Sequence, residues 1–170
     1  MTPAGDPAAD VVLLRDATDG DVPDILRCIQ ALAAYERLEH ECVATEARLR
    51  ETLFGADPVA SVVLAEHGGT VVGFALWFRS YSTFLARPGI YLEDLFVFPS
   101  HRGRGVGRRL LAHLARRATA GGSGRLEWAV LDWNADAIRF YGSLGAVPMA
   151  DWTTFRLAGD PLLALGVVSA

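Results

Sequence analysis

The segment from Arg102 to Arg108 reads RGRGVGR, so three glycines alternate with other residues and arginines flank them. It follows an apolar run that ends at Pro99 and precedes a leucine-rich stretch at helical spacing. The first N–H groups of a helix have no partner inside the helix and carry the positive end of its dipole. Glycines allow a phosphate to approach these groups closely. The segment therefore predicts a pyrophosphate-binding site at the start of a helix.

Two adjacent acids and one tyrosine are the other residues that could do chemistry. Glu93 and Asp94 interrupt an otherwise apolar strand. Because successive side chains on a strand face opposite sides, we expect only one of them to line a given cleft directly. A salt bridge at the strand end is the alternative. Tyr141 lies in a later helix pattern, where a tyrosine packed in the core is the alternative to a catalytic one.

The apolar pattern predicts the elements that must position these residues. Strands are expected over 11–17, 59–66, 70–80, 89–99, 125–132 and 152–158, with a hairpin turn at 67–69. Helices are expected over 18–38, with Asp19 or Asp21 as cap and Pro23 in the first turn, over 46–54 after a Thr45 cap, from the glycine segment to about Ala120, and over 134–145. Asn134 would cap the last of these, and Gly145 would follow its end. This order predicts an α/β sandwich with helices on a mixed sheet.

Length and composition fit one folded domain. The chain has 170 residues, of which 51% are hydrophobic and 21% charged, which excludes a disordered chain. We expect a disordered leader over 1–10 and a single domain over 11–170. The longest apolar run, 71–78, is too short to span a bilayer. The two cysteines, Cys28 and Cys42, lack metal-site spacing, which favours a reduced cytoplasmic protein without a metal.

Charge is distributed unevenly along the chain. Residues 101–126 contain seven arginines and no acid, whereas residues 1–100 contain seven arginines and 15 acids. The asymmetry indicates two ligands of opposite charge, although a solvated helix face is the alternative. A basic helix could also bind nucleic acid, but no aromatic residues alternate with these arginines. We therefore expect no nucleic acid and no membrane as partner.

Two well-known phosphate loops do not fit the glycine segment. A P-loop needs a lysine, and the chain contains none. The dinucleotide fingerprint needs a third glycine where Arg108 stands, and it should follow the first strand. What remains is the pattern Arg/Gln-x-x-Gly-x-Gly/Ala, which resembles the acetyl-CoA loop of the GNAT-fold N-acetyltransferases. The stretches DILRCIQALAAYE, YLEDLFVFPSHRGRGVG and AVLDWNADAIRFYGSLGA together resemble the diamine acetyltransferases, which include spermidine/spermine and thialysine acetyltransferases. The resemblance runs from about Leu13 to Leu157.

The resemblance implies a GNAT fold, with a mostly antiparallel mixed sheet and helices on both faces, and acetyl-CoA as co-substrate. It implies that Glu93 is the general base through a water, that Tyr141 is the general acid, and that Tyr35, Glu36, Glu93 and Asp94 bind the amine. The cofactor-binding residues that it implies are Leu95, Phe96, Val97, Arg102, Gly103, Arg104, Gly105, Val106, Gly107, Arg108, Asn134 and Tyr141.

The expected substrate is a small amine. Glu36, Glu39 and Glu41 could attract a cation, although a solvated acidic helix end is the alternative. The loop 79–89 has Phe84 and Leu85 where spermine-acetylating relatives tend to have tryptophan, and it has no acid, which favours short amines.

The resemblance also implies a homodimer, and the apolar tail 161–170 could pack on the domain or on a partner subunit. No cysteine lies near the motifs, so we expect direct transfer in a ternary complex. The alternatives are a GNAT enzyme that acts on protein N-termini or an antibiotic, and a non-catalytic acyl-CoA-binding module.

Overall fold

The computed structural model describes residues 11–167 and contains two compact units, one ending at Ala129 and the other beginning at Val130. The predicted leader 1–10 and the last three residues of the apolar tail lie outside the described residues.

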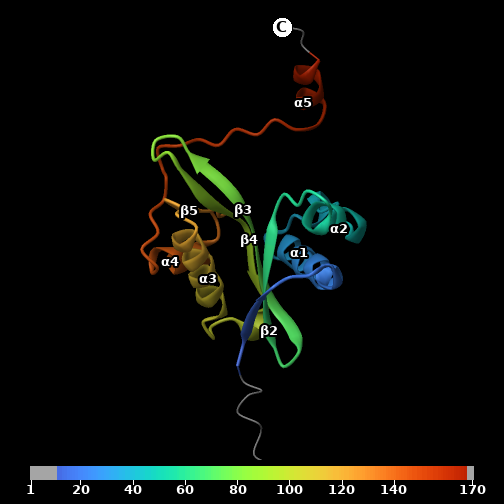
Figure 1. Ribbon diagram of the computed structural model, residues 1–170, viewed down its shortest axis with the longest axis vertical. Helices are drawn as coiled ribbons and strands as arrows, with labels where there is room; N and C mark the ends of the chain where they lie inside the picture. Colours follow the sequence, from blue (N-terminus) through green and yellow to red (C-terminus); the bar gives the residue numbers. More distant parts are fainter. Residues whose placement is uncertain (1–10, 168–170) are drawn as a thin grey trace, which may run out of the picture. The chain divides into compact units, whose positions relative to one another are not determined.

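The first unit is built on a five-stranded sheet in the order β1-β2-β3-β4-β5 (Figure 1). Its strands are β1 (Leu13–Asp16), β2 (Ser61–His67), β3 (Thr70–Ser82), β4 (Arg87–Val97) and β5 (Leu126–Glu127). All neighbouring pairs are antiparallel except β4 and β5, which are parallel. The β2–β3 turn contains Gly68 and Gly69 at φ values of 56° and 78°, a left-handed backbone that suits glycine. The predicted hairpin is confirmed.

Helices cover both faces of this sheet, because its central strands are apolar on both sides. On one side, α1 (Val22–Glu36) and α2 (Glu46–Phe54) share a core with Leu64 and Phe74 of the sheet. On the other side, α3 (Val106–Ala120) buries Leu110 and Leu114 (Figure 1). The predicted fold class, a mixed and mostly antiparallel sheet between helices, is confirmed.

The predicted capping residue is confirmed at the start of α2, whereas at the start of α1 the carboxylate of Asp21 has a different role. Thr45 caps α2 as expected, since its Oγ1 accepts a hydrogen bond from the Arg48 N–H at 3.3 Å. Asp21 precedes α1, but its carboxylate makes no cap bond to that helix. It accepts hydrogen bonds from Arg15 and Thr18 instead, and its pKa is lowered chiefly by the Arg15 guanidinium. Asp21 therefore ties β1 to the start of α1.

The second unit contains α4 (Ala135–Gly142) and α5 (Gly159–Gly166). Asn134 caps α4 as predicted, because its Oδ1 accepts from the Ala137 N–H at 3.2 Å. Gly145 follows the helix at a φ of 86°. Part of the apolar tail forms α5, whose leucines Leu162, Leu163 and Leu165 are exposed.

Two strand predictions were wrong in extent or in kind. Residues 152–158 form no strand, because β-favouring side chains such as Trp152 and Phe155 need a sheet edge and have no partner strand among residues 11–167. The strand expected over 125–132 is reduced to Leu126 and Glu127, the two residues that pair with β4.

None of the helices within residues 11–167 is long and apolar enough to cross a membrane.

Candidate active site

A bulge in β4 shapes the site. Leu76 of β3 faces Asp94, and Trp77 faces Leu92, so Glu93 is an extra residue without a partner on β3. Bulges of this kind bend a strand and redirect side chains, and they are frequent beside active sites. Here the bulge brings Glu93 and Asp94 to the wall of one pocket. The expectation that only one of these acids could line a cleft was therefore wrong, because it assumed an unbroken strand.

On the side of β4 where β5 pairs, the residues after the bulge have no neighbouring strand among the described residues. Among the described residues, β5 pairs with β4 only at Ile90 and Tyr91. The stretch that the sequence proposes for the cofactor's pantetheine arm, Leu95, Phe96 and Val97, is thus free of a neighbouring strand on that side. Main-chain N–H and C=O groups on such an edge can pair with the amides of an extended ligand.

The glycine segment lies at the end of this edge and forms an open turn. A short 3₁₀ helix, η4 (Pro99–His101), leads into it, and α3 begins at Val106. Gly103 and Gly105 have φ values of 73° and 77°, and a Cβ at either position would meet no atom within 4 Å. The turn is therefore accessible, and its left-handed backbone is one that glycine adopts without strain.

The N-terminus of α3 offers donors to an anion. The first helix N–H with a backbone acceptor is that of Arg109, which donates to the Gly105 carbonyl at 3.0 Å. The preceding N–H groups of Val106, Gly107 and Arg108 have no acceptor in the hydrogen bonds found within residues 11–167. Arg104 and Arg108 are exposed and form no ion pair with a described residue. This donor set fits the diphosphate of coenzyme A.

Arg102 is used differently from the other arginines of the loop. Its Nε donates to the Val97 carbonyl at 2.8 Å, and its guanidinium lies 4.5 Å from the centroid of the Tyr35 ring and 5.4 Å from that of Phe96. Such cation–π contacts contribute about 0.5–1 kcal/mol at exposed sites. The side chain of Arg102 therefore links the loop to β4 and to the last turn of α1.

Two histidines also support the loop, and sequence reasoning missed them. His101 Nδ1 lies 2.9 Å from Ser100 Oγ, and its Nε2 lies 3.2 Å from Nδ1 of His67 in the β2–β3 hairpin. No local pattern could indicate their contact, because the two residues are 34 positions apart in the sequence.

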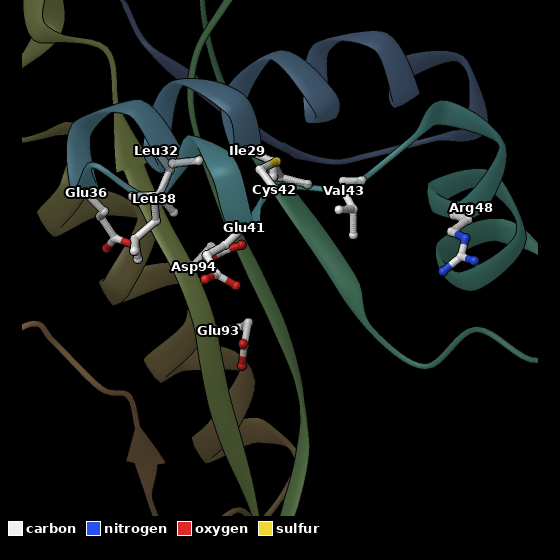
Figure 2. Close-up of a pocket in the computed structure, with 12 residues that line it drawn as sticks. Ile29, Leu32, Glu36, Leu38, Glu41, Cys42, Val43, Arg48, Glu93 and Asp94 are labelled. Atoms are coloured by element: carbon white, nitrogen blue, oxygen red, sulfur yellow. The ribbon is translucent and has the colours of Figure 1, made fainter. Parts of the chain in front are cut away.

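An acidic pocket of about 520 Å³ lies beside the bulge, between α1, β4 and the 3₁₀ helix η3 (Glu39–Glu41) (Figure 2). Four carboxylates line it, those of Glu36, Glu41, Glu93 and Asp94, together with apolar side chains from α1 and the following loop. Tyr35 and Glu39 are not among the lining residues. Of the predicted Tyr35–Glu36 pair, Glu36 thus lines the pocket and Tyr35 contacts the cofactor loop.

The pocket raises the pKa of two of its carboxyl groups. Burial, and then the negative charges of Glu93 and Glu36, raise the pKa of Asp94 to about 6. Burial also raises the pKa of Glu36. Because the pocket disfavours the charged forms of Asp94 and Glu36, a cationic ligand bound there would stabilise these forms.

The pocket contains two residues that the sequence did not indicate. Cys42 lies on its wall, which contradicts the expectation that no cysteine is near the site. Arg48, from the first turn of α2, also lines it. Both come from the segment after α1, whose path along β4 no local pattern indicates.

Asn134 and Tyr141 belong to the second unit and are described only within it. Tyr141 is half-buried in the last turn of α4, where its ring lies 5.3 Å from that of Phe140. The first unit therefore contains the predicted residues from Tyr35 to Arg108, and the roles of all the predicted site residues, Asn134 and Tyr141 included, stay predictions.

Known proteins with similar sequence or structure point to one family. Residues 26–146 match the Acetyltransferase (GNAT) family. Thialysine N-epsilon-acetyltransferase of Bos taurus is 38% identical over 91% of this chain and 96% of its own length. L-ornithine N5-acetyltransferase NATA1 of Arabidopsis thaliana is 34% identical over 89% of this chain and 86% of its own length. A solved integron cassette protein of V. cholerae superimposes with a TM-score of 0.79 at 27% identity, covering 92% of this chain and 98% of that one.

These matches confirm the resemblance to the diamine acetyltransferases and remove the support for a non-catalytic module. The chain belongs to the acetyltransferase (GNAT) family and is an acetyl-CoA-dependent N-acetyltransferase.

Proposed function

We propose that this enzyme acetylates a primary amine of a small cationic substrate, namely a diamine, a polyamine or a thialysine-like compound. The observation that carries the proposal is the pocket with four carboxylates at the β4 bulge. A cation in that pocket offsets the electrostatic cost that raises the pKa of Asp94 and Glu36. The similar thialysine and ornithine acetyltransferases, by their names, act on amines of this size.

Acetyl-CoA would be held by the first unit along two adjoining features. The N–H groups from Gly103 to Arg108 and the side chains of Arg104 and Arg108 would bind the diphosphate. The open main-chain edge at Leu95, Phe96 and Val97 would pair with the pantetheine arm, to which Asn134 would add a contact. When bound, the cofactor supplies the acetyl group as an activated thioester.

The side chains of the pocket would manage the protons. An alkyl ammonium has a pKa of about 10, so it must lose a proton before it can attack. Glu93 is the proposed general base, through a water, and Asp94 holds the positive end of the substrate. The Tyr141 hydroxyl is the proposed donor of the proton that the departing thiolate needs.

Transfer is proposed to be direct, in a ternary complex. Cys42 is the one cysteine among the residues that line the pocket, so it is the residue to test as an acyl carrier. Initial-rate kinetics should give intersecting double-reciprocal lines, and Cys42→Ser should retain turnover. Parallel lines together with an inactive serine variant would show an acylated cysteine instead.

The enzyme is further proposed to be a cytoplasmic homodimer, with its active sites near the subunit interface. The exposed apolar side chains of α5, such as Leu163, support a partner surface.

A substrate panel tests the proposed function. Purified protein with acetyl-CoA is assayed against putrescine, ornithine, thialysine, spermidine, spermine, an N-terminal peptide and an aminoglycoside. We expect the highest kcat/KM for the short amines, because the loop 79–89 contains no acid that could pair with a further cation of a long polyamine. Preferred acetylation of the peptide or of the aminoglycoside would contradict the proposal.

A further inference from the structure

Arg48 is the only cation among the residues that line the acidic pocket. It lies in the first turn of α2, where its N–H is held by the Thr45 cap at 3.3 Å and its carbonyl accepts from Thr52 Oγ1 at 2.8 Å. These hydrogen bonds hold the backbone of Arg48 in α2, and the helix therefore determines the direction in which its side chain leaves the backbone.

The guanidinium of Arg48 has no ion-pair partner within residues 11–167. Arg50, two residues along the same helix, differs in both respects: its Nε binds the Asp19 carboxylate at 2.9 Å, and it does not line the pocket. Arg48 thus places an unpaired guanidinium at the pocket, whereas the guanidinium of Arg50 forms an ion pair within the fold.

The charges in the pocket are separated in space. Figure 2 shows Arg48 on α2 at one end and Glu36, Glu41 and Asp94 grouped toward the other. The wall also contains Ile29, Leu32, Leu38 and Val43, which are apolar. A ligand that matches this arrangement has a cation at one end, an aliphatic chain and an anion at the other end.

We infer that the pocket selects diamino acids over diamines and polyamines, with Arg48 binding the substrate's carboxylate. The inference rests on the proposed function, whose substrate it specifies. The side-chain ammonium would lie among the carboxylates beside the open edge of β4, and the carboxylate would accept a two-point hydrogen bond from the guanidinium. A diamine lacks this carboxylate, and a longer polyamine would bring a second cation toward Arg48, which is repulsive.

Matched substrate pairs test the inference. Ornithine and putrescine, and likewise lysine and cadaverine, differ only by the carboxylate. We expect Arg48→Ala to raise the KM for ornithine at least about tenfold, the size of effect of a lost charge-assisted hydrogen bond. The KM for putrescine should stay the same or fall. Arg48→Lys, which keeps the charge, should show a smaller rise in the KM for ornithine than Arg48→Ala. Arg50→Ala, on the same helix, should change neither the KM for ornithine nor the KM for putrescine.

Calorimetric binding of the same four compounds, in the presence of coenzyme A, separates this inference from the proposed function. Wild-type binding that favours ornithine and loses this preference in Arg48→Ala supports the inference, even if no compound is acetylated. Suppose that amines are acetylated, but that Arg48→Ala weakens the binding of ornithine and putrescine equally or weakens neither. This result overturns the inference and leaves the proposed function intact. Absence of both binding and turnover for all four compounds overturns both.

Discussion

At the scale of single residues, Asp94 shows best what the sequence could and could not predict. The adjacent acids Glu93 and Asp94 were recognisable as unusual in an apolar strand. Their common orientation was not, because it depends on the register between β3 and β4, where Leu92 and Asp94 face successive residues of the partner strand. Sequence patterns report which residues a strand contains, but a bulge is decided by pairing with residues far along the chain.

Asp94→Asn should stabilise the protein in a pH-dependent way. The folded-state pKa of Asp94, about 6, lies above the unfolded-state value of 3.8. Between these values the folded state holds the proton more tightly, so the contribution of Asp94 to stability falls as pH rises and stays low above about 6. Asparagine does not titrate. Its advantage over the wild type should therefore be small at pH 4 and reach roughly 3 kcal/mol at pH 7.

Urea unfolding of both proteins at half-unit steps of pH measures this difference. A difference in unfolding free energy that does not change between pH 4 and pH 7 would mean that Asp94 is not held in a charge-disfavouring environment.

Tyr141→Phe tests the proposed general acid. Removal of the hydroxyl should lower kcat by about 10²-fold or more, the usual range for a lost proton donor, and should leave the dissociation constant of acetyl-CoA nearly unchanged. Stopped-flow or steady-state rates, together with equilibrium binding, provide the two readouts. Unchanged turnover would remove Tyr141 from the proposed mechanism and return it to a packing role beside Phe140.

At the scale of elements, most of the helices and the β2–β3 hairpin followed from local signals. The Thr45 and Asn134 caps are examples, because each is satisfied within three residues of its own position. The strand over 152–158 was wrong for the opposite reason: its composition favours a strand, but pairing requires an edge elsewhere. Local chemistry was therefore predictable, and long-range pairing was not.

Arg102 connects the cofactor loop with the end of α1, two elements that no sequence pattern linked. Because its guanidinium lies against Tyr35 and its Nε binds the Val97 carbonyl, Arg102→Ala should loosen both. We expect the KM to rise for acetyl-CoA and for the amine. Arg104→Ala, which removes an exposed side chain from the same loop, should raise only the KM for acetyl-CoA.

Steady-state kinetics with each substrate varied in turn checks this pair of variants. If Arg102→Ala affects acetyl-CoA alone, as the control does, the contact with Tyr35 has no part in positioning the amine site.

At the scale of the whole molecule, the arginines of the basic segment 101–126 fall into two groups, those that form ion pairs within the fold and those that are available to a ligand. Part of the arginine-rich segment serves the fold: Arg117 pairs with Asp16 at 2.5 Å and Arg125 with Glu127 at 2.6 Å. Arg104 and Arg108, at the start of α3, form no ion pair with any residue from 11 to 167. The turn at Gly103 and Gly105 is therefore open, as a cofactor loop requires, while at least two of the seven arginines in 101–126 form ion pairs within the fold.

Protection of the backbone amides at the glycine turn shows whether this turn binds the diphosphate of acetyl-CoA. Amide hydrogen exchange is followed by NMR with saturating acetyl-CoA and, in parallel, with S-acetylpantetheine, which lacks the diphosphate. Exchange of the N–H groups of Val106, Gly107 and Arg108 should be slowed by acetyl-CoA and not by the shorter compound. Equal protection by both compounds, or protection only at another part of the chain, would show that this turn does not bind the diphosphate.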